Sequence, residues 1–470
     1  MNRDELRARA GKLLRFQKRF GKCFPRRETR EHAAKYVEGL LVSEGRKNVE
    51  RMVLQEVGGK EVDRADVLAR QHFLTASPWD AGDVQREIQA VFAESLAPTT
   101  ERWSLGTVVV IDESSFIKQG EDSVGVKEQY CGRLREVANC QVGVFLVGVT
   151  PGGECLLDQE LYLPADWARD RDRRRKVRVP EEVTFRTKGQ IAADLVRRLL
   201  ANGSVQPAWI TGDEVYGEDG NLLDDLEADS LRYVMEVSCT KTFWTLDPAT
   251  QIPPQRFSSG RPPSRPRRTS VRSAKAIAME LAPEAWQPLL LREGAKGPVI
   301  YEYARVRVWD VRHRNPGPPT WLMFQRDVDR PQHLLCWVSN ADKSVSLETL
   351  AQVASQRVRI EQFFEEAKGE VGMADYEARA WTSWHHHMAL VALAHLFVTT
   401  MRLELRDATP KLTLRQSFDL LRAAFARPRL TETEAMRLLK YHLQRNETAT
   451  KSHRKSWLQK HPRLAEKLML

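Results

Sequence analysis

Cysteine is scarce in this 470-residue chain, and the features of secreted and membrane proteins are missing. The six cysteines are scattered without any CxxC pair, so the sequence indicates neither a zinc site nor a disulfide framework, and we expect reduced core residues. No apolar run approaches the roughly 20 residues that cross a bilayer. The N-terminal residues MNRDELRARAGK contain no apolar segment for a signal peptidase, and no internal repeat is present. These absences predict a cytosolic protein.

The composition favours a large protein with a polyanionic partner. With 42% hydrophobic residues, the chain can bury a sizeable core and is long enough for more than one domain. Lys and Arg outnumber Asp and Glu by 73 to 63, which gives a net charge of +10, and the excess gathers in segments. Nucleic acid is the first candidate for the partner of such a chain.

The first 97 residues show the period of helices, with basic and apolar residues interleaved. We expect a helical bundle there. Within it, the helix predicted at residues 48–58 follows a polar turn, which is compatible with a helix-turn-helix that binds DNA. A packing bundle with a basic surface explains the same pattern, and the sequence does not separate the two.

Two short apolar runs each end in an aspartate. Residues 107–112, TVVVID, predict a buried central strand with Asp112 at its C-terminal end, and residues 208–210 lead in the same way to Asp213. In open α/β sheets, ligands bind at the C-terminal ends of the strands. The helix predicted at 188–203 alternates with these strands, which indicates an α/β fold. Further strands are expected at 140–150, 155–164 and 232–240, the first two as an antiparallel pair.

Two arginine-rich segments are candidates for phosphate contacts. Residues 169–180 are too charged to be buried and predict a basic loop, either solvated or in contact with a phosphate backbone. Residues 241–340 contain an irregular stretch rich in Pro, Gly, Ser and Arg, followed by alternating segments that predict a β-hairpin. We therefore expect an inserted, β-rich subdomain with an Arg-rich loop. The candidate DNA contacts in these segments are Arg173, Arg174, Arg175, Lys176, Arg267 and Arg268.

Residues 352–370 have the sequence QVASQRVRIEQFFEEAKGE and predict a helix. This helix is central to the interpretation, because we interpret the other elements as serving it. Its apolar residues recur at helical spacing and form one stripe that can be buried. Arg357, Glu361 and Lys368 lie four and then seven residues apart, which puts them along one line beside that stripe. A carboxylate between two cations can bind a metal or a phosphate. A solvated, salt-bridged face of an ordinary amphipathic helix explains the same pattern.

Helical patterns continue to the C-terminus. Residues 384–405 predict a long buried helix, and the three consecutive histidines 385–387 cannot share one helix face, which argues against a metal cluster. From about residue 411, two or three basic amphipathic helices lead to a tail rich in Lys, Arg and His. This tail is either solvated or a further DNA contact.

Asp112, Asp213 and Glu361 are the candidate catalytic acids and metal ligands. Hard divalent cations such as Mg²⁺ and Mn²⁺ bind carboxylate oxygens together with phosphate oxygens, so three convergent acids suit a pair of metal ions. Such a pair activates the attacking oxygen and stabilises the leaving oxygen of a phosphoryl transfer. Arg357 and Lys368 would then face the phosphodiester.

Three long motifs, in this order, resemble those of insertion-sequence transposases of the DDE superfamily. The phrases IDESSFIKQGEDSVGVKEQYCGRLREVANCQVGVFL and ITGDEVYG resemble the blocks around the first and second catalytic Asp. The phrase RVRIEQFFEEAKGEVGMADYEARAWTSWHHH resembles the signature helix, usually written Tyr-Arg-Glu-Lys. The resemblance covers roughly residues 107–397 and implies an RNase H-like catalytic core with a β-rich insertion. The expected division is a helical DNA-binding region (1–97), the core (98–240 and 341–405), the insertion (241–340) and a basic helical region (406–470).

Carried over by position, the resemblance implies that Asp112, Asp213 and Glu361 bind two Mg²⁺ or Mn²⁺ ions. It also implies that Arg357 and Lys368 contact the DNA backbone or a flipped base near the scissile phosphate. Ala354 stands where the signature has Tyr, so that contact is missing or supplied elsewhere. A second departure is Glu113, directly after Asp112, which leaves open which of the two binds metal. We favour Asp112, because Glu113 has a longer side chain and points away from Asp112 by strand alternation.

The resemblance implies a transposase that cuts and joins the ends of its own mobile element. Its partners would be the terminal inverted repeats and the target DNA, and a homodimer is expected on DNA because two ends must be brought together. One alternative is a captured transposase that acts as a sequence-specific DNA-binding regulator, against which the intact acids argue. The other is a site-specific endonuclease without strand transfer, which the sequence does not distinguish from the transposase.

Overall fold

The computed structural model describes residues 12–57, 64–132, 134–252, 270–294, 297–406, 412–425 and 432–467, with the single residues 266 and 409. The chain forms two compact units. The first unit comprises Met1–Thr107, Ile111–Gln206 and Val358–Glu447, and the second comprises Val108–Val110, Pro207–Arg357 and Thr448–Leu470. This division into units does not test the predicted domain boundaries, which stay a prediction.

The strands of the first unit follow the order β2-β3-β1, and β4 pairs with β3 on a branch of the sheet. These strands are β1 (Val108–Ile117), β2 (Lys127–Cys131), β3 (Glu136–Thr150) and β4 (Gly153–Leu161). The β3–β4 pair is antiparallel, with Thr150 opposite Gly153 across a two-residue turn, which confirms the predicted meander. Strand β4 is wholly buried, although it contains several charged residues, and β3 is buried from Cys140 onwards, where its sequence is largely apolar.

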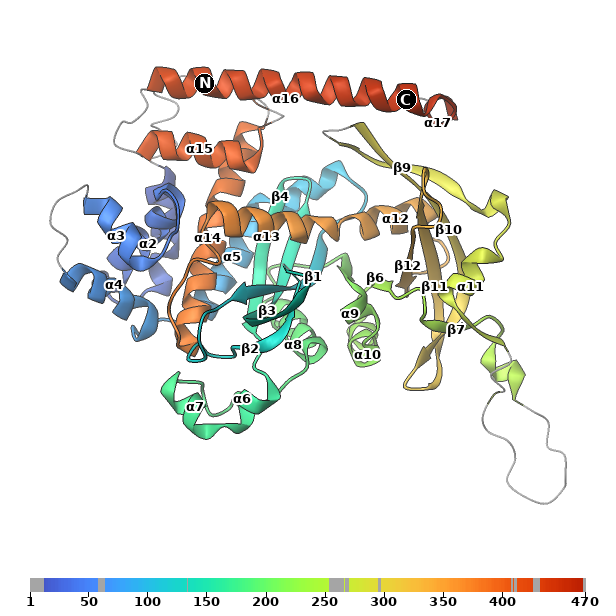
Figure 1. Cartoon of the computed structure of the whole chain (residues 1–470), viewed down its shortest axis with the longest axis horizontal. Coiled ribbons are helices and arrows are strands. Elements are labelled where there is room, and N and C mark those ends of the chain that lie inside the picture. The colour runs from blue at the N-terminus through green and yellow to red at the C-terminus, as the bar shows by residue number, and fades with distance from the viewer. Residues whose placement is uncertain are drawn as a thin grey trace. The chain divides into compact units, whose positions relative to one another are not determined.

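Helices cover the strands of the first unit. They are α2 (Arg27–Val42), α3 (Val49–Val57), α4 (Arg64–Thr75), α5 (Ala81–Ser95), α6 (Ala165–Arg169), α7 (Arg171–Lys176), α8 (Lys188–Asn202), α13 (Val358–Glu370), α14 (Trp381–Leu405) and α15 (Leu414–Phe425). The central helix is α14, which packs against β4, α5, α2, α4 and α15 (Figure 1). Helix α3 packs on α2 and α4, as in the predicted N-terminal bundle. Binding of DNA by α3 stays a prediction.

Helix α14 corrects the expectation that no segment of the chain is long and apolar enough to span a membrane. It has 25 residues, and its most apolar stretch of 18 residues has a mean hydropathy of 1.5. That stretch is 78% buried inside the protein. Since a core helix meets the same criteria of length and composition, burial identifies α14 as the centre of the first unit's core.

The second unit is built on a long sheet with the order β1-β5-β6-β12-β11-β10-β7-β8, in which β9 pairs with β10. Its strands are β5 (Trp209–Gly212), β6 (Tyr233–Val237), β7 (Thr242–Trp244), β8 (Val271–Ser273), β9 (Gln287–Gly294), β10 (Gly297–Arg312), β11 (Asn315–Asp327) and β12 (Leu334–Ser339). Strands β5 and β6 are parallel, and β6, β12, β11 and β10 are each antiparallel to the next. The helices of this unit are α9 (Glu214–Gly217), α10 (Gly220–Ala228), α11 (Ala274–Met279) and α12 (Leu347–Ser355).

Strands β10 and β11 form the predicted hairpin of the insertion (Figure 1). The two residues of its turn, His313 and Arg314, have positive φ angles of 50° and 64°. This is the backbone of a two-residue turn whose twist matches the flanking strands. The alternation of side chains along these strands therefore gave the correct pairing.

The described residues after 431 form α16 (Glu432–Lys460) and α17 (Pro462–Lys467), which flank His461. The predicted basic tail, KSHRKSWLQKHPR, lies in these helices and is mostly exposed, as expected of a solvated segment, and its contact with DNA stays a prediction. Within the second unit this segment contacts β9 and β10: Arg454 forms an ion pair of 2.8 Å with Glu293, and Trp457 lies against Gly297.

Candidate active site

Asp112 lies in the middle of β1 and not at its end, which corrects the prediction. The strand continues through Ser114, Ser115 and Phe116, all of which are buried, to Ile117. The polar residues 112–115, DESS, suggested the end of the strand. They remain in the strand because Phe116, which follows them, is itself part of the core. The side chain of Asp112 is half-buried, and its Oδ1 accepts a hydrogen bond of 2.7 Å from the backbone N–H of Glu113.

Glu113 has a different environment. Its carboxylate forms an ion pair with the ammonium of Lys188, the first residue of α8, and both side chains are largely shielded from solvent. The sequence offered no signal for this pairing, because 75 residues separate the two. An acid engaged with a lysine is the weaker candidate for a metal ligand, so the pairing supports the choice of Asp112.

Asp213 occupies the position that the sequence predicts, directly after the buried strand β5. It is the N-cap of the short helix α9, and its Oδ1 accepts a hydrogen bond of 3.0 Å from the backbone N–H of Val215. The turn behind it is tightly packed, since a Cβ at Gly217 would lie only 1.9 Å from the backbone oxygen of Glu236. Glycine at 217 therefore allows α9, and with it Asp213, to lie directly on β6.

The predicted helix 352–370 is broken into α12 and α13. Ser346 caps α12, as predicted, but the helix ends at Ser355. The backbone oxygen of Gln352 accepts from Ser355 Oγ at 2.7 Å and from Gln356 Nε2 at 3.0 Å. The backbone N–H groups of Gln356 and Arg357 bond three residues back instead of four. Side-chain competition for a helical carbonyl thus tightens the turn and ends the helix.

Arg357 consequently lies in the connection and not on the helix of Glu361, so the predicted single line of Arg357, Glu361 and Lys368 is wrong. Its Nε forms an ion pair of 2.9 Å with Glu236 of β6, inside the second unit. Glu361 lies in the first turn of α13 and is exposed, where the helix dipole favours a carboxylate. Lys368 lies in the last turn, where the dipole favours a cation.

Helix α13 packs on β4 and α15, and Lys368 links it to β1. The stripe Ile360, Phe363, Phe364 and Ala367 is buried, as the sequence predicts. The ammonium of Lys368 donates a hydrogen bond of 3.1 Å to the backbone oxygen of Ser115, and lies 5.2 Å from the ring centroid of Phe116. Lys368 therefore links the Glu361 helix to the strand that carries Asp112.

The end of α13 is fastened by a residue that the sequence analysis did not single out. Lys47, in the connection between α2 and α3, is 2% exposed, and its ammonium donates to the backbone oxygens of Leu40 and Glu370. Its backbone N–H donates to Asp375 Oδ2 at 2.8 Å. Burial lowers the pKa of Lys47 to about 7. A lysine among many in a basic segment gives no sequence signal for such a position.

The three candidate acids are divided between the units: Asp112 and Glu361 belong to the first and Asp213 to the second. Within either unit by itself, the described residues contain no group of three or more His, Cys, Asp or Glu side chains that could hold a metal ion. That the three carboxylates converge stays a prediction. The donor set fits a hard divalent cation, because it consists of carboxylate oxygens only, on side chains that are half-buried or exposed.

The basic segment 169–180 is not a loop but contains the two short helices α6 and α7. Asp170 starts α7 by accepting a hydrogen bond from the N–H of Arg173. Arg173 lies over the ring of Trp167, and Arg174 donates to backbone oxygens on either side of α7, so both support the fold. Arg175 and Lys176 are exposed and remain the better candidates for DNA contacts. Arg267 and Arg268 lie outside the described residues.

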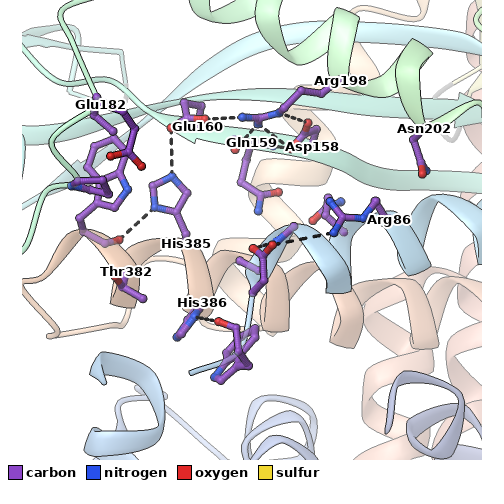
Figure 2. Close-up of a pocket in the computed structure, with 18 of the residues that line it drawn as sticks. Arg86, Asp158, Gln159, Glu160, Glu182, Arg198, Asn202, Thr382, His385 and His386 are labelled. Carbon is purple, nitrogen blue, oxygen red and sulfur yellow. Dashed lines mark hydrogen bonds and ion pairs between the residues drawn. The ribbon is translucent and has the colours of Figure 1, made fainter. Parts of the chain in front are cut away.

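A polar cavity of about 950 Å³ in the first unit lies apart from the candidate acids, since neither Asp112 nor Glu361 lines it (Figure 2). On its β4 wall, Asp158 and Glu160 are bound by the guanidinium of Arg198. Glu160 also lies 3.4 Å from Nε2 of His385. These contacts balance buried charges and keep β4, α8 and α14 together.

The histidines of α14 are engaged by separate parts of the first unit. The ring nitrogens of His386 contact the backbone oxygens of Leu74 and Trp79, and burial lowers the pKa of His386 to about 4. His387 contacts the hydroxyl of Tyr36, and burial lowers its pKa to about 3. Each imidazole has a packing role, which agrees with the argument against a shared metal.

Two comparisons with known proteins bear on these residues. The chain is 28% identical over 206 residues to a protein of Microchaete diplosiphon named as a probable transposase for insertion sequence element IS701. That match covers 44% of this chain and 48% of the relative, so the chain spans about half the length of the curated relative it matches. Residues 19–298 match a family described as DDE superfamily endonuclease, which confirms the resemblance and supports an RNase H-like core. The chain belongs to the DDE superfamily endonuclease family.

Proposed function

We propose that this protein is a metal-dependent DNA transposase that cleaves and joins the ends of its own mobile element. The observation that carries the proposal is the placement of the three candidate acids on separate elements. Asp112 lies on a buried strand, Asp213 caps a helix directly after another strand, and Glu361 begins a helix packed by an apolar stripe. The relative's name, which refers to transposition, supports the proposal.

Asp112, Asp213 and Glu361 would hold the divalent cations, which we propose to be two Mg²⁺ or Mn²⁺ ions. Bound there, the ions would lower the pKa of water and stabilise charge on phosphate oxygens. The backbone N–H groups of Glu113 and Val215 each fix one oxygen of an aspartate. Ordered carboxylates of this kind bind metal without first losing side-chain freedom, which favours a strong site.

The chain's own cations would position the DNA. Arg357 and Lys368 are half-buried and already oriented by Glu236 and by the backbone of Ser115, so they would present N–H donors with little loss of rotamer freedom. Exposed Arg175 and Lys176 would add phosphate contacts farther along the DNA. Catalysis in such a site depends mainly on positioning and on electrostatic stabilisation.

We further propose that the substrates are the terminal inverted repeats of the element and a target DNA, and that a homodimer assembles on them. Two ends must be joined in one reaction, and two copies supply two sets of acids. The place of action would be the bacterial cytoplasm, at the chromosome.

The test is cleavage of a plasmid that carries the candidate element ends, with and without Mg²⁺ or Mn²⁺. A metal contributes several kcal/mol of transition-state stabilisation, and each 1.36 kcal/mol is a factor of ten. Glu361→Gln or Asp112→Asn should therefore lower the rate about 100-fold or more, with DNA binding retained. The matched control is Glu113→Gln, which removes the acid paired with Lys188 and should keep most of the activity.

The reaction products distinguish a transposase from an endonuclease and from a DNA-binding regulator. Joined as well as cut DNA supports a transposase, whereas cut DNA without joined products would identify a site-specific endonuclease. Firm binding without cutting in the wild type would identify a regulator. Cutting that persists in Glu361→Gln would remove this residue from the mechanism.

A further inference from the structure

Two arginines on the β10–β11 hairpin share one tryptophan. Arg305 and Arg307 are alternate residues of β10, so their side chains lie on the same face of the sheet. Their guanidinium carbons lie 4.1 Å and 5.2 Å from the ring centroid of Trp321, which is directly opposite Arg307 on β11. We call these three residues the Arg–Trp patch.

Within the described residues, the only acid that acts on the charges of the patch is Asp342, which raises the pKa of Arg307 from a distance and forms no ion pair with it. Neither Arg305 nor Arg307 forms an ion pair with a carboxylate there, and their donors bond backbone oxygens instead. Arg305 donates to Val345 at 2.6 Å and Arg307 to Pro319 at 2.9 Å. The Nε of Arg307 is buried and has no hydrogen-bond partner.

This arrangement is costly without an anion. Burial lowers the pKa of both guanidinium groups, and the charge of Arg307 lowers the pKa of Arg305 further. Two like charges in partly shielded positions repel each other, and an unpaired buried donor also costs free energy. A bound anion would remove the first of these costs, because it neutralises the two charges.

A second Arg–Trp pair, between Arg326 of the same hairpin and Trp286 directly before β9, shows that contact with a tryptophan ring does not by itself leave an arginine without an ion pair. Arg326 of β11 lies 3.9 Å from the ring centroid of Trp286, as close as the patch arginines lie to Trp321. Its Nε is paired with Glu302 at 2.7 Å, so its charge is already balanced. The difference between the two pairs is that Arg326 forms an ion pair with a carboxylate and the arginines of the patch do not.

The register places the patch on the sheet face that also holds Arg357. Arg305 is opposite Met323, Met323 is opposite Trp337, and Trp337 is opposite Glu236. Directly opposed residues of neighbouring strands share a face, and Glu236 is the ion-pair partner of Arg357. One face of the sheet in the second unit thus carries both the Arg–Trp patch and Glu236, the ion-pair partner of Arg357.

We propose that Arg305, Arg307 and Trp321 form a binding site for the phosphodiester backbone of double-stranded DNA. The inference rests on the proposed function, which supplies DNA as the ligand. Because both guanidinium groups lie against the ring of Trp321, its role is to orient them and not to stack on a base. The patch would hold DNA against the second unit without regard to sequence, since phosphate contacts carry no base information.

The test measures binding of the full chain to a 30-base-pair duplex of arbitrary sequence by fluorescence anisotropy, at several salt concentrations between about 50 and 200 mM. Each phosphate contact contributes about 0.9 to the slope of log affinity against log salt. The double variant Arg305→Gln/Arg307→Gln should reduce that slope by about 1.8. Arg305→Lys/Arg307→Lys keeps both charges and should keep the slope, and Arg326→Gln is the matched control and should also leave it unchanged.

An unchanged slope in the double glutamine variant would overturn the proposal, as would an equal loss in Arg326→Gln. Thermal melting shows whether the double variant folds. If the double variant does not fold, the single variants Arg305→Gln and Arg307→Gln test the proposal. Each should reduce the slope of log affinity against log salt by about 0.9. A wild-type chain that binds no duplex would refute the proposed function itself. A wild-type chain that binds the duplex with a salt slope that the patch variants do not change would refute only the role of the patch.

Discussion

The buried ammonium of Lys47 predicts that stability rises with pH above neutrality. Burial lowers its pKa from the ordinary 10.5 to about 7, with the charge of Arg422 as the second cause. In the unfolded chain the ordinary value returns. Between these two pKa values, the unfolded state binds a proton that the native state does not, so the free energy of unfolding increases with pH.

The size of the effect follows from the two pKa values. At pH 7 the native lysine is about half protonated, whereas at pH 9 it is neutral and the unfolded one is still charged. Proton linkage then gives an increase of about 2 kcal/mol in the free energy of unfolding between pH 7 and pH 9. Below about pH 6 both states are protonated and the contribution of Lys47 no longer changes.

Urea unfolding followed by circular dichroism at pH 7, 8 and 9, at constant ionic strength, measures this increase. Lys47→Met removes the titrating group, so its stability should rise by about 2 kcal/mol less than that of the wild type over this range. The control is Lys12→Met, since Lys12 is an exposed lysine at the same end of the chain, paired with Glu404. Equal pH dependence in wild type and Lys47→Met would refute the assignment of a neutralised Lys47 at the end of α13.

Three substitutions test the packing around the candidate site. Gly217→Ala places a Cβ 1.9 Å from a backbone oxygen and should cost about 1–3 kcal/mol of stability by overpacking, measured by thermal melting; a melting temperature equal to the wild type's would contradict this packing. Gly369→Ala meets nothing within 4 Å on the exposed side of α13 and should stabilise by about 0.5–1 kcal/mol, and a lower melting temperature would show that the space is not open. Arg198→Met leaves Asp158 without its guanidinium partner, whereas Glu160 keeps Arg186, and should cost about 3–5 kcal/mol in urea unfolding. A loss below about 1 kcal/mol would mean that Asp158 is not buried as a charge.

Local patterns in the sequence predicted the elements well where one side of each element is buried. The alternation in β10 and β11, the apolar run before Asp213 and the stripe of α13 each follow from a core that accepts only apolar side chains. Periodicity failed at two boundaries. Strand β1 continues beyond Asp112 because the later residue Phe116 enters the core, and α12 ends early because polar side chains compete for the oxygen of Gln352.

Partners of charged residues could not be predicted, because the sequence does not show which distant groups meet. Basic residues 173–176 look equivalent in the sequence, yet two of them are engaged with Trp167 and with backbone oxygens while the other two are exposed. Lys47 is likewise one lysine of a basic segment until the fold brings it to the end of α13. Tertiary contacts decide whether a charge serves the fold or is available to a ligand.

The same distinction bears on the choice between adjacent acids. In the sequence, Asp112 and Glu113 are equally acidic neighbours in one motif. The structure gives Glu113 an ammonium, from Lys188, and gives Asp112 a backbone amide that fixes one oxygen. Asp213 is oriented in the same way, by the amide of Val215. Binding of a metal to Glu113 would first have to release the ammonium of Lys188. The ion pair of Glu113 is therefore the physical reason to expect that Glu113→Gln keeps cleavage, whereas we expect Asp112→Asn to abolish it.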